Sequence, residues 1–147
     1  MATRVLESVD VPATMRPRLS VDDAYGYTQI LCNGDVIDSD SQDELVRSAK
    51  FALDAQPRGK SVAWIGGGIC HGPRLFAIAD CKQTVYEIEP ALAEFCPEGV
   101  TFIPGDYRDT LTGTYDVIIY DLGGAVPVEL LSRHLKRGGV ILPKEDR

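Results

Sequence analysis

The sequence predicts an α/β protein: a mostly parallel β-sheet covered by helices on both faces, preceded by a small β-hairpin element. Two observations predict the sheet. Short apolar runs alternate with helical segments from residue 60 onward, which is typical of repeated strand–helix units. These runs are continuously apolar, as expected for strands that are buried on both faces. A third observation, an Asn-Gly pair between two apolar runs, predicts the hairpin.

The hairpin is expected where Asn33-Gly34 separates the run 25–32 from the run 35–37. Asn-Gly favours a two-residue turn because both turn residues adopt positive φ. Two further short strands are expected nearer the N-terminus, at 4–11 and 18–21.

The segment after the hairpin predicts a helix that ends near Gln56. Asp40 or Ser41 is suited to cap its start, and apolar side chains then recur at helical spacing until a proline follows. We therefore divide the chain into an N-terminal β-hairpin element, residues 1–38, and a second domain, residues 39–147.

Five strands with intervening helices are expected in the second domain. The expected strands are residues 62–65, 84–87, 100–103, 115–120 and 140–142, and the expected helices are residues 73–79, 90–95 and 126–135. Arg108, Asp109 and residues 136–139 are expected in loops and turns. Few residues follow the last run, so we expect a sheet that is truncated after its fifth strand.

A glycine-rich turn follows the first expected strand. Gly66, Gly67 and Gly68 lie between this strand and the next helix, and Glu87 ends the second strand about 20 residues later. A strand, a glycine turn, a helix and a later acidic residue are typical of Rossmann-like nucleotide-binding domains. Glu87 could then accept hydrogen bonds from two ribose hydroxyls. The alternative is that the glycines only make a tight connection between strand and helix.

Residues suited to ligand contact follow four successive strands: Gly66, Glu87, Asp106 and Asp121. Because the carboxyl ends of parallel strands meet at one edge of the sheet, these residues are expected to lie near one another. Four such strand ends are a stronger indication of a ligand site than the glycines alone.

The motifs at these strand ends resemble those of class I S-adenosylmethionine-dependent methyltransferases, and are most similar to the spermidine synthase branch. The resemblance rests on Trp64-Ile-Gly-Gly-Gly68, Glu87-Ile-Glu89, Gly105-Asp106 and residues 115–121, with weaker matches in 25–44. It implies that the ligand is S-adenosylmethionine or its decarboxylated form.

The resemblance also implies a role for each site residue. Gly66, Gly67 and Gly68 would pack against the amino-acid or sulfonium part of the ligand, and Glu87 would take the ribose hydroxyls. At the adenine end, Asp106 would accept from the amino group while Tyr107 or Ile88 lines the ring. Asp121, the one residue to which the resemblance assigns catalysis, would lie beside the sulfonium and the incoming nucleophile.

Three departures from the aminopropyltransferase pattern leave three functions open. Gly124 stands where a second acidic residue is expected, and neither 69–71 nor 45–47 carries the expected side chains. Methyl transfer to a small molecule is the first function. Transfer of an aminopropyl group, or lyase chemistry, is the second. A non-catalytic member that binds a ligand or a partner is the third.

Charge and composition narrow the partners. The net charge of -7 argues against tight non-specific binding of nucleic acid and would attract a cationic substrate. No apolar run has membrane-spanning length, and the four cysteines show no metal-binding spacing. We expect a cytoplasmic protein without a metal site that acts on a small molecule, and homo-oligomerisation that covers an open sheet edge.

Overall fold

The structure is a computed structural model. It describes residues 3–6, 19–22, 29–32 and 35–39 as backbone strands. It describes residues 47, 50–52, 54–67, 70–121 and 127–143 with their side chains, that of His71 excepted.

The N-terminal strands form a four-stranded antiparallel sheet in the order β1-β2-β3-β4. These strands are β1 (Thr3–Leu6), β2 (Leu19–Asp22), β3 (Gln29–Cys32) and β4 (Asp35–Ser39). Cys32 pairs with Asp35, so the expected hairpin between β3 and β4 is confirmed. The element is larger than a hairpin, because β2 also pairs with β1 and with β3.

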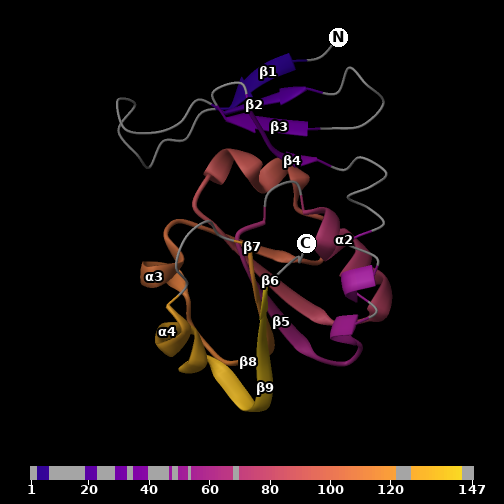
Figure 1. The fold of residues 1–147 in the computed structure, drawn as a ribbon, viewed down its shortest axis with the longest axis vertical. Helices are drawn as coiled ribbons and strands as arrows, with labels where there is room; N and C mark the ends of the chain where they lie inside the picture. Colours follow the sequence, from indigo (N-terminus) through magenta and orange to yellow (C-terminus); the bar gives the residue numbers. More distant parts are fainter. Residues whose placement is uncertain are drawn as a thin grey trace.

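The second sheet has five parallel strands in the order β7-β6-β5-β8-β9 (Figure 1). They are β5 (Ser61–Ile65), β6 (Lys82–Glu87), β7 (Thr101–Pro104), β8 (Tyr115–Tyr120) and β9 (Leu135–Pro143). The central strand β5 has β6 and β7 on one side and β8 and β9 on the other. The direction in which successive strands are added to the sheet therefore changes at β5. This arrangement confirms the predicted Rossmann-like sheet and places a switch in strand order beside the glycine turn.

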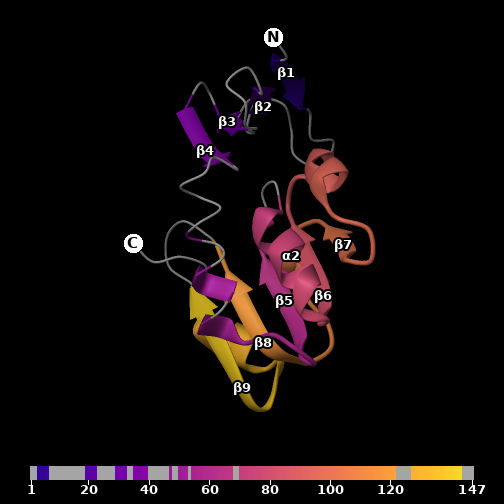
Figure 2. The same cartoon turned by 90° about the vertical axis from the view of Figure 1, so that its right-hand side faces the viewer.

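Helices cover both faces of this sheet. On one side lie α2 (His71–Phe76) and the 3-10 helix η1 (Ala77–Ala79), and α2 lies over β5 and β6 in Figure 2. On the other side lie α3 (Tyr107–Thr110) and α4 (Val128–Ser132). A second 3-10 helix, η2 (Pro90–Phe95), connects β6 to β7.

Successive residues of β5 point into two separate apolar cores. Val62 and Trp64 belong to the core that contains Phe76 of α2. Ala63 and Ile65 belong to the core that contains Leu131 of α4. All four residues of the β5 run are at most 1% exposed. This two-sided burial is the physical reason why the strand is continuously apolar.

The last part of the chain differs from its prediction. The expected helix 126–135 is shorter: α4 ends at Ser132, and Leu135 already begins β9. The expected turn 136–139 lies inside β9, where the register shifts between the pairs Tyr115–Leu135 and Val117–Val140. Gly138, with φ 83, provides the left-handed backbone of this irregularity.

Two loop predictions are also corrected. Arg108 and Asp109 lie in α3, because Asp106 caps this helix by accepting a hydrogen bond from the Arg108 backbone N–H.

The expected helix 90–95 is present as a 3-10 helix. None of the helices in the described part of the chain has the length and apolar character needed to span a bilayer.

Candidate ligand site at the carboxyl edge of the sheet

The strand ends that the sequence singled out lie at one edge of the five-stranded sheet. Ile65 pairs with both Tyr86 and Tyr120, and Glu87 pairs with Pro104. Gly66, Glu87 and Asp121, which follow Ile65, Tyr86 and Tyr120, therefore lie at the same level as Pro104, and Gly105 and Asp106 follow directly.

Glu87 holds the glycine turn. Its carboxylate accepts the Gly67 N–H through Oε1 at 2.9 Å and the Glu89 N–H through Oε2 at 3.0 Å. The side chain is buried, with 7% of the residue exposed. Each carboxylate oxygen can accept more than one hydrogen bond, so holding the turn is compatible with binding a ligand hydroxyl. The glycine backbone and the acidic strand end thus form one structural unit.

The turn itself lies close to β6. Gly66 has φ 94, and its N–H donates to the Tyr86 carbonyl at 2.8 Å. A Cβ atom on Gly67 would lie 2.6 Å from Cγ1 of Val85, so no larger residue fits without movement. The predicted ligand contact at Gly68 lies outside the described residues, as does the side chain of His71.

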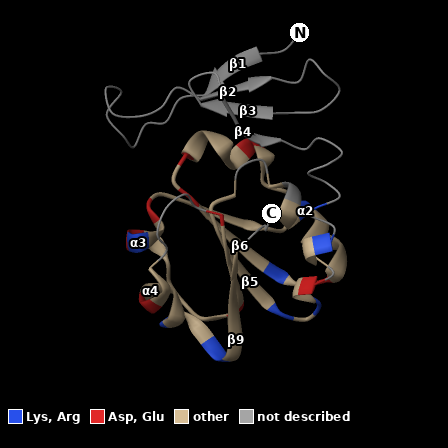
Figure 3. Cartoon of the chain, viewed as in Figure 1, with Lys and Arg blue, Asp and Glu red and all other residues tan. Residues whose placement is uncertain are grey.

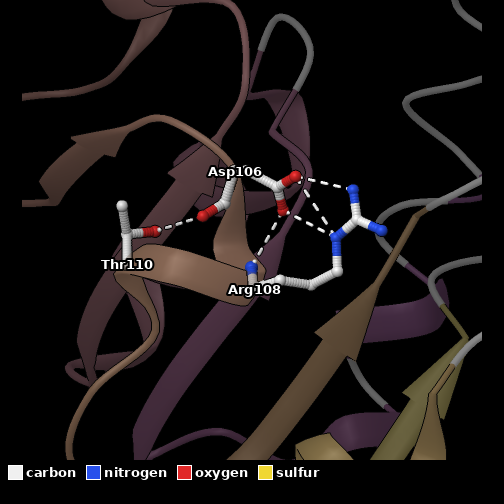
Figure 4. Close-up of polar contacts among 3 residues, drawn as sticks. All are labelled: Asp106, Arg108 and Thr110. Carbon is white, nitrogen blue, oxygen red and sulfur yellow. Dashed lines mark hydrogen bonds and ion pairs between the residues drawn. The ribbon is translucent and has the colours of Figure 1, made fainter.

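Asp106 stands next to Glu87 in space. The N–H of Gly105 donates to the Glu87 carbonyl at 2.9 Å, which ties the end of β7 to the end of β6. The Asp106 carboxylate accepts a hydrogen bond from the Arg108 backbone N–H at 2.9 Å and further hydrogen bonds from the Arg108 guanidinium (Figure 4). Hydrogen bonds from Arg108 hold the pKa of Asp106 below its ordinary value.

The two residues expected to line an adenine ring have different surroundings. Ile88 follows Glu87 and is 48% exposed, so it offers apolar surface at the edge of the sheet. Tyr107 is half-buried and packs against the core that contains Leu111 and Leu131. Ile88 is therefore the more accessible of the two.

Asp121 follows β8 directly. Its backbone N–H donates to the Ile65 carbonyl at 2.9 Å, so its position is tied to the central strand. The residue is exposed, and residues 122–126 after it lie outside the described residues. Asp121 and the glycine turn lie on either side of the end of β5.

Charge is distributed unevenly along the strands. Glu87, Glu89, Asp106 and Asp121 follow or end strands at the carboxyl edge. Basic residues stand near the opposite edge, at the start of β5, β6 and β9: Lys60, Lys82, Lys136 and Arg137 (Figure 3). Arg108 pairs with Asp106 at the carboxyl edge, and Asp116 lies beside Lys136 at the opposite edge. The remaining acidic side chains favour a cationic ligand at the carboxyl edge.

Among the described residues at this edge, Cys70 is not a nucleophilic thiol and no metal centre is formed. Cys70 precedes α2 and is fully buried, and burial raises the pKa of its thiol to about 12. In the described part of the chain, no group of three His, Cys, Asp or Glu residues could hold a metal ion.

Comparison with known proteins gives a result for structure only. No family model and no curated protein matches the chain. A spermidine synthase in complex with the transition-state analogue AdoDATO superposes with a TM-score of 0.67 and 18% identity, over 94% of this chain and 55% of that one. Trm5b from Pyrococcus abyssi gives a TM-score of 0.63 and 20% identity, over 84% and 39%.

An S-adenosylmethionine-dependent methyltransferase from Thiobacillus denitrificans, in complex with S-adenosyl-L-homocysteine, gives a TM-score of 0.57 and 22% identity. The match covers 70% of this chain and 48% of that one. The chain has the class I methyltransferase fold. It spans about half the length of the solved structures that it matches, between 39% and 55% for these three.

Within this class I methyltransferase fold, two positioning contacts were not expected from the sequence. Trp64 Nε1 donates to Gln83 Oε1 at 2.7 Å, and Gln83 Nε2 donates to the Pro73 carbonyl at 2.9 Å. This buried relay connects β5 through β6 to α2, the helix after the glycine turn. Gln83 precedes the expected strand 84–87, and no local pattern in the sequence indicated that its side chain is buried.

The other unexpected contact of the class I methyltransferase fold is the guanidinium of Arg108 on Asp106. The sequence pattern Gly105-Asp-Tyr-Arg108 contains a signal for it, because an aspartate after a glycine readily caps a short helix. Capping brings the fourth residue of the pattern, Arg108, back toward the carboxylate.

Proposed function

We propose that this chain binds S-adenosylmethionine at the carboxyl edge of its parallel sheet and transfers the methyl group to a small molecule. The observation that carries the proposal is the buried Glu87 carboxylate bonded to the Gly67 N–H at 2.9 Å. It joins the acidic strand end to the glycine turn, beside the switch in strand order where ligands of such sheets bind.

The residues present fit this ligand. The carboxylate of Glu87 suits a ribose diol, exposed Ile88 suits one face of a purine, and the acidic edge suits a cationic sulfur. When bound, S-adenosylmethionine supplies a methyl group on a positively charged sulfur. The sulfur leaves readily as a neutral thioether.

The chain's own residues then have mainly positioning roles. Glu87 and the glycine backbone hold one end of the ligand, and Asp121 stands across the end of β5 from them. The Asp121 carboxylate would orient an acceptor and take its proton. Positioning is sufficient for most of the rate gain in such a displacement, because alignment of reactants is itself a large effect.

A second candidate function is transfer of an aminopropyl group from decarboxylated S-adenosylmethionine. It is favoured by the fold match to a spermidine synthase, which covers 94% of this chain. It is disfavoured by Gly124, because a glycine offers no carboxylate to hold a second amine. A chain that only binds the ligand or a partner is the third candidate.

We also propose a small and cationic acceptor, no nucleic-acid partner and a cytoplasmic location. The acidic carboxyl edge and the net charge of -7 support the first two. The free thiols Cys70, Cys81 and Cys96 fit a reducing compartment.

Product analysis tests the proposal. The purified protein is incubated with S-adenosylmethionine and candidate amines, and products are separated by chromatography. S-Adenosylhomocysteine supports methyl transfer, whereas methylthioadenosine supports attack on the other arm. A thermal shift on adding ligand, without turnover, would favour the binding-only chain. Neither turnover nor a thermal shift would refute all three.

A further inference from the structure

The Arg108 side chain occupies the carboxylate that the adenine amino group would need. Its Nε lies 3.0 Å from Oδ1 and 3.2 Å from Oδ2 of Asp106, and its Nη2 lies 2.6 Å from Oδ2. Oδ1 also accepts the Arg108 backbone N–H at 2.9 Å. Figure 4 shows the guanidinium folded back over the carboxylate.

These contacts use the acceptor capacity of the carboxylate. A carboxylate offers about four acceptor directions. Three N–H groups of Arg108 make four contacts with the two oxygens of Asp106, because the Nε–H is shared between Oδ1 and Oδ2. An amino group from a ligand must therefore compete with the guanidinium for Oδ1 and Oδ2. The guanidinium can swing into solvent, because 66% of the Arg108 side chain is exposed, compared with 27% of the Asp106 side chain.

We propose that Arg108 is a specificity-determining latch: its guanidinium competes with the adenine amino group for the Asp106 carboxylate. This inference rests on the proposed function, because it assumes an adenosine ligand at this edge. The latch lowers the affinity for every adenosine ligand and weakens the preference for adenine over bases without an amino group.

The cost of opening the latch is small but measurable. Exposed ion pairs contribute little in water, and two-point guanidinium–carboxylate contacts contribute more than single ones. Removing the guanidinium should therefore increase affinity by about threefold to tenfold. The backbone N–H of residue 108 still caps α3 in such a variant, so the helix is retained.

Calorimetry on Arg108→Gln tests the latch with two probes. These are S-adenosylhomocysteine and S-inosylhomocysteine, in which an oxygen replaces the amino group of adenine. We expect Arg108→Gln to bind S-adenosylhomocysteine about threefold to tenfold more tightly than the wild type, with no gain for the inosine compound. Asp106→Asn in the same background should abolish the gain. The matched control is Arg137→Gln in β9 near the opposite edge, which should keep the wild-type affinities.

Salt gives a second readout that a structural role would not produce. Salt screens an exposed ion pair, so wild-type affinity for S-adenosylhomocysteine should rise with salt relative to that of Arg108→Gln. Equal or weaker binding by a folded Arg108→Gln, or an equal gain for both probes, would overturn the latch alone. Absence of binding in all variants and the wild type would overturn the proposed function and the latch with it.

Discussion

At the scale of single residues, one buried carboxylate has a structural task and, under the proposed function, a second one. Glu87 fixes the glycine turn by accepting the N–H groups of Gly67 and Glu89. We propose that it also accepts the ribose hydroxyls of the ligand. Asp106 is likewise both a helix cap and the partner of Arg108. Residues that hold the backbone of a site in place and also contact its ligand leave little room for substitution.

Glu87→Ala should weaken binding of S-adenosylhomocysteine by about 1–3 kcal/mol, because charge-assisted hydrogen bonds to the ribose are lost. Isothermal calorimetry measures the change. Glu98→Ala, an exposed glutamate just before β7, is the control for the loss of one negative charge. Unchanged affinity in a folded Glu87→Ala protein would remove Glu87 from the site.

Cys70 should resist alkylation in the native protein. It is fully buried, and burial raises the pKa of its thiol to about 12, so the reactive thiolate is scarce near neutral pH. Iodoacetamide treatment at mildly alkaline pH, followed by mass spectrometry of peptides, reports each cysteine separately. Cys70 should be modified only in denaturant. Rapid native labelling of Cys70 while half-buried Cys81 stays unmodified would contradict the burial.

At the scale of elements, polar side chains connect strands that are remote in sequence. Asp116 accepts the backbone N–H and the hydroxyl of Ser61 at 2.9 and 3.1 Å, and its carboxylate lies 3.7 Å from Nζ of Lys136. One carboxylate thus links the starts of β5, β8 and β9. At the same end of β9, Gly139 lies so close to Asp116 that a Cβ would be 2.8 Å from the Asp116 carbonyl oxygen.

Asp116→Asn should lower the stability of the fold in a pH-dependent way. Hydrogen bonds from Ser61 hold the pKa of Asp116 below its ordinary value, so its stabilisation is present above about pH 4 and is lost as pH falls through the lowered pKa. Because the side chain is 35% exposed, we expect a loss of about 1 kcal/mol or less at neutral pH.

Urea denaturation at neutral pH and below about pH 3 measures this difference. The gap between wild type and Asp116→Asn should narrow at the lower pH. Asp54→Asn, an exposed aspartate in the helix before β5, is the matched control and should show no such pH dependence. A gap that widens on acidification would reverse the sign of the argument.

At the scale of the whole molecule, the edges of the parallel sheet matter. In the described part of the chain, β9 pairs only with β8, so its outer edge offers backbone groups to another strand. We propose that a second copy of the chain covers this edge. Val140 in β9 is 44% exposed and would lie in that contact.

Light scattering at micromolar concentration should therefore give the mass of an oligomer. Val140→Lys should shift the protein toward monomer, because a charged side chain at a strand edge disfavours pairing. Val128→Lys, an exposed valine of α4, is the matched control and should leave the mass unchanged. A monomeric wild-type protein would refute the proposal.

Local patterns in the sequence determined most of the fold. Residues 115–120 were expected as a strand and form β8 with the same bounds. Asn33-Gly34 predicted the pairing of β3 with β4, and the glycine turn predicted the change from β5 to α2. These features follow from apolar periodicity and turn chemistry, which act over a few residues.

The sequence alone also predicted that the candidate site residues lie at one edge of the sheet, because parallel strands bring their carboxyl ends together. Only the tertiary structure decided which side chains meet there and elsewhere. The Asp116–Ser61 pair joins residues 55 positions apart. The irregularity inside β9 is defined only by its pairing with β8, where the register shifts between Leu135 and Val140. Contacts of this kind depend on the register between distant segments, and that register is set by packing of the whole sheet, which no local pattern encodes.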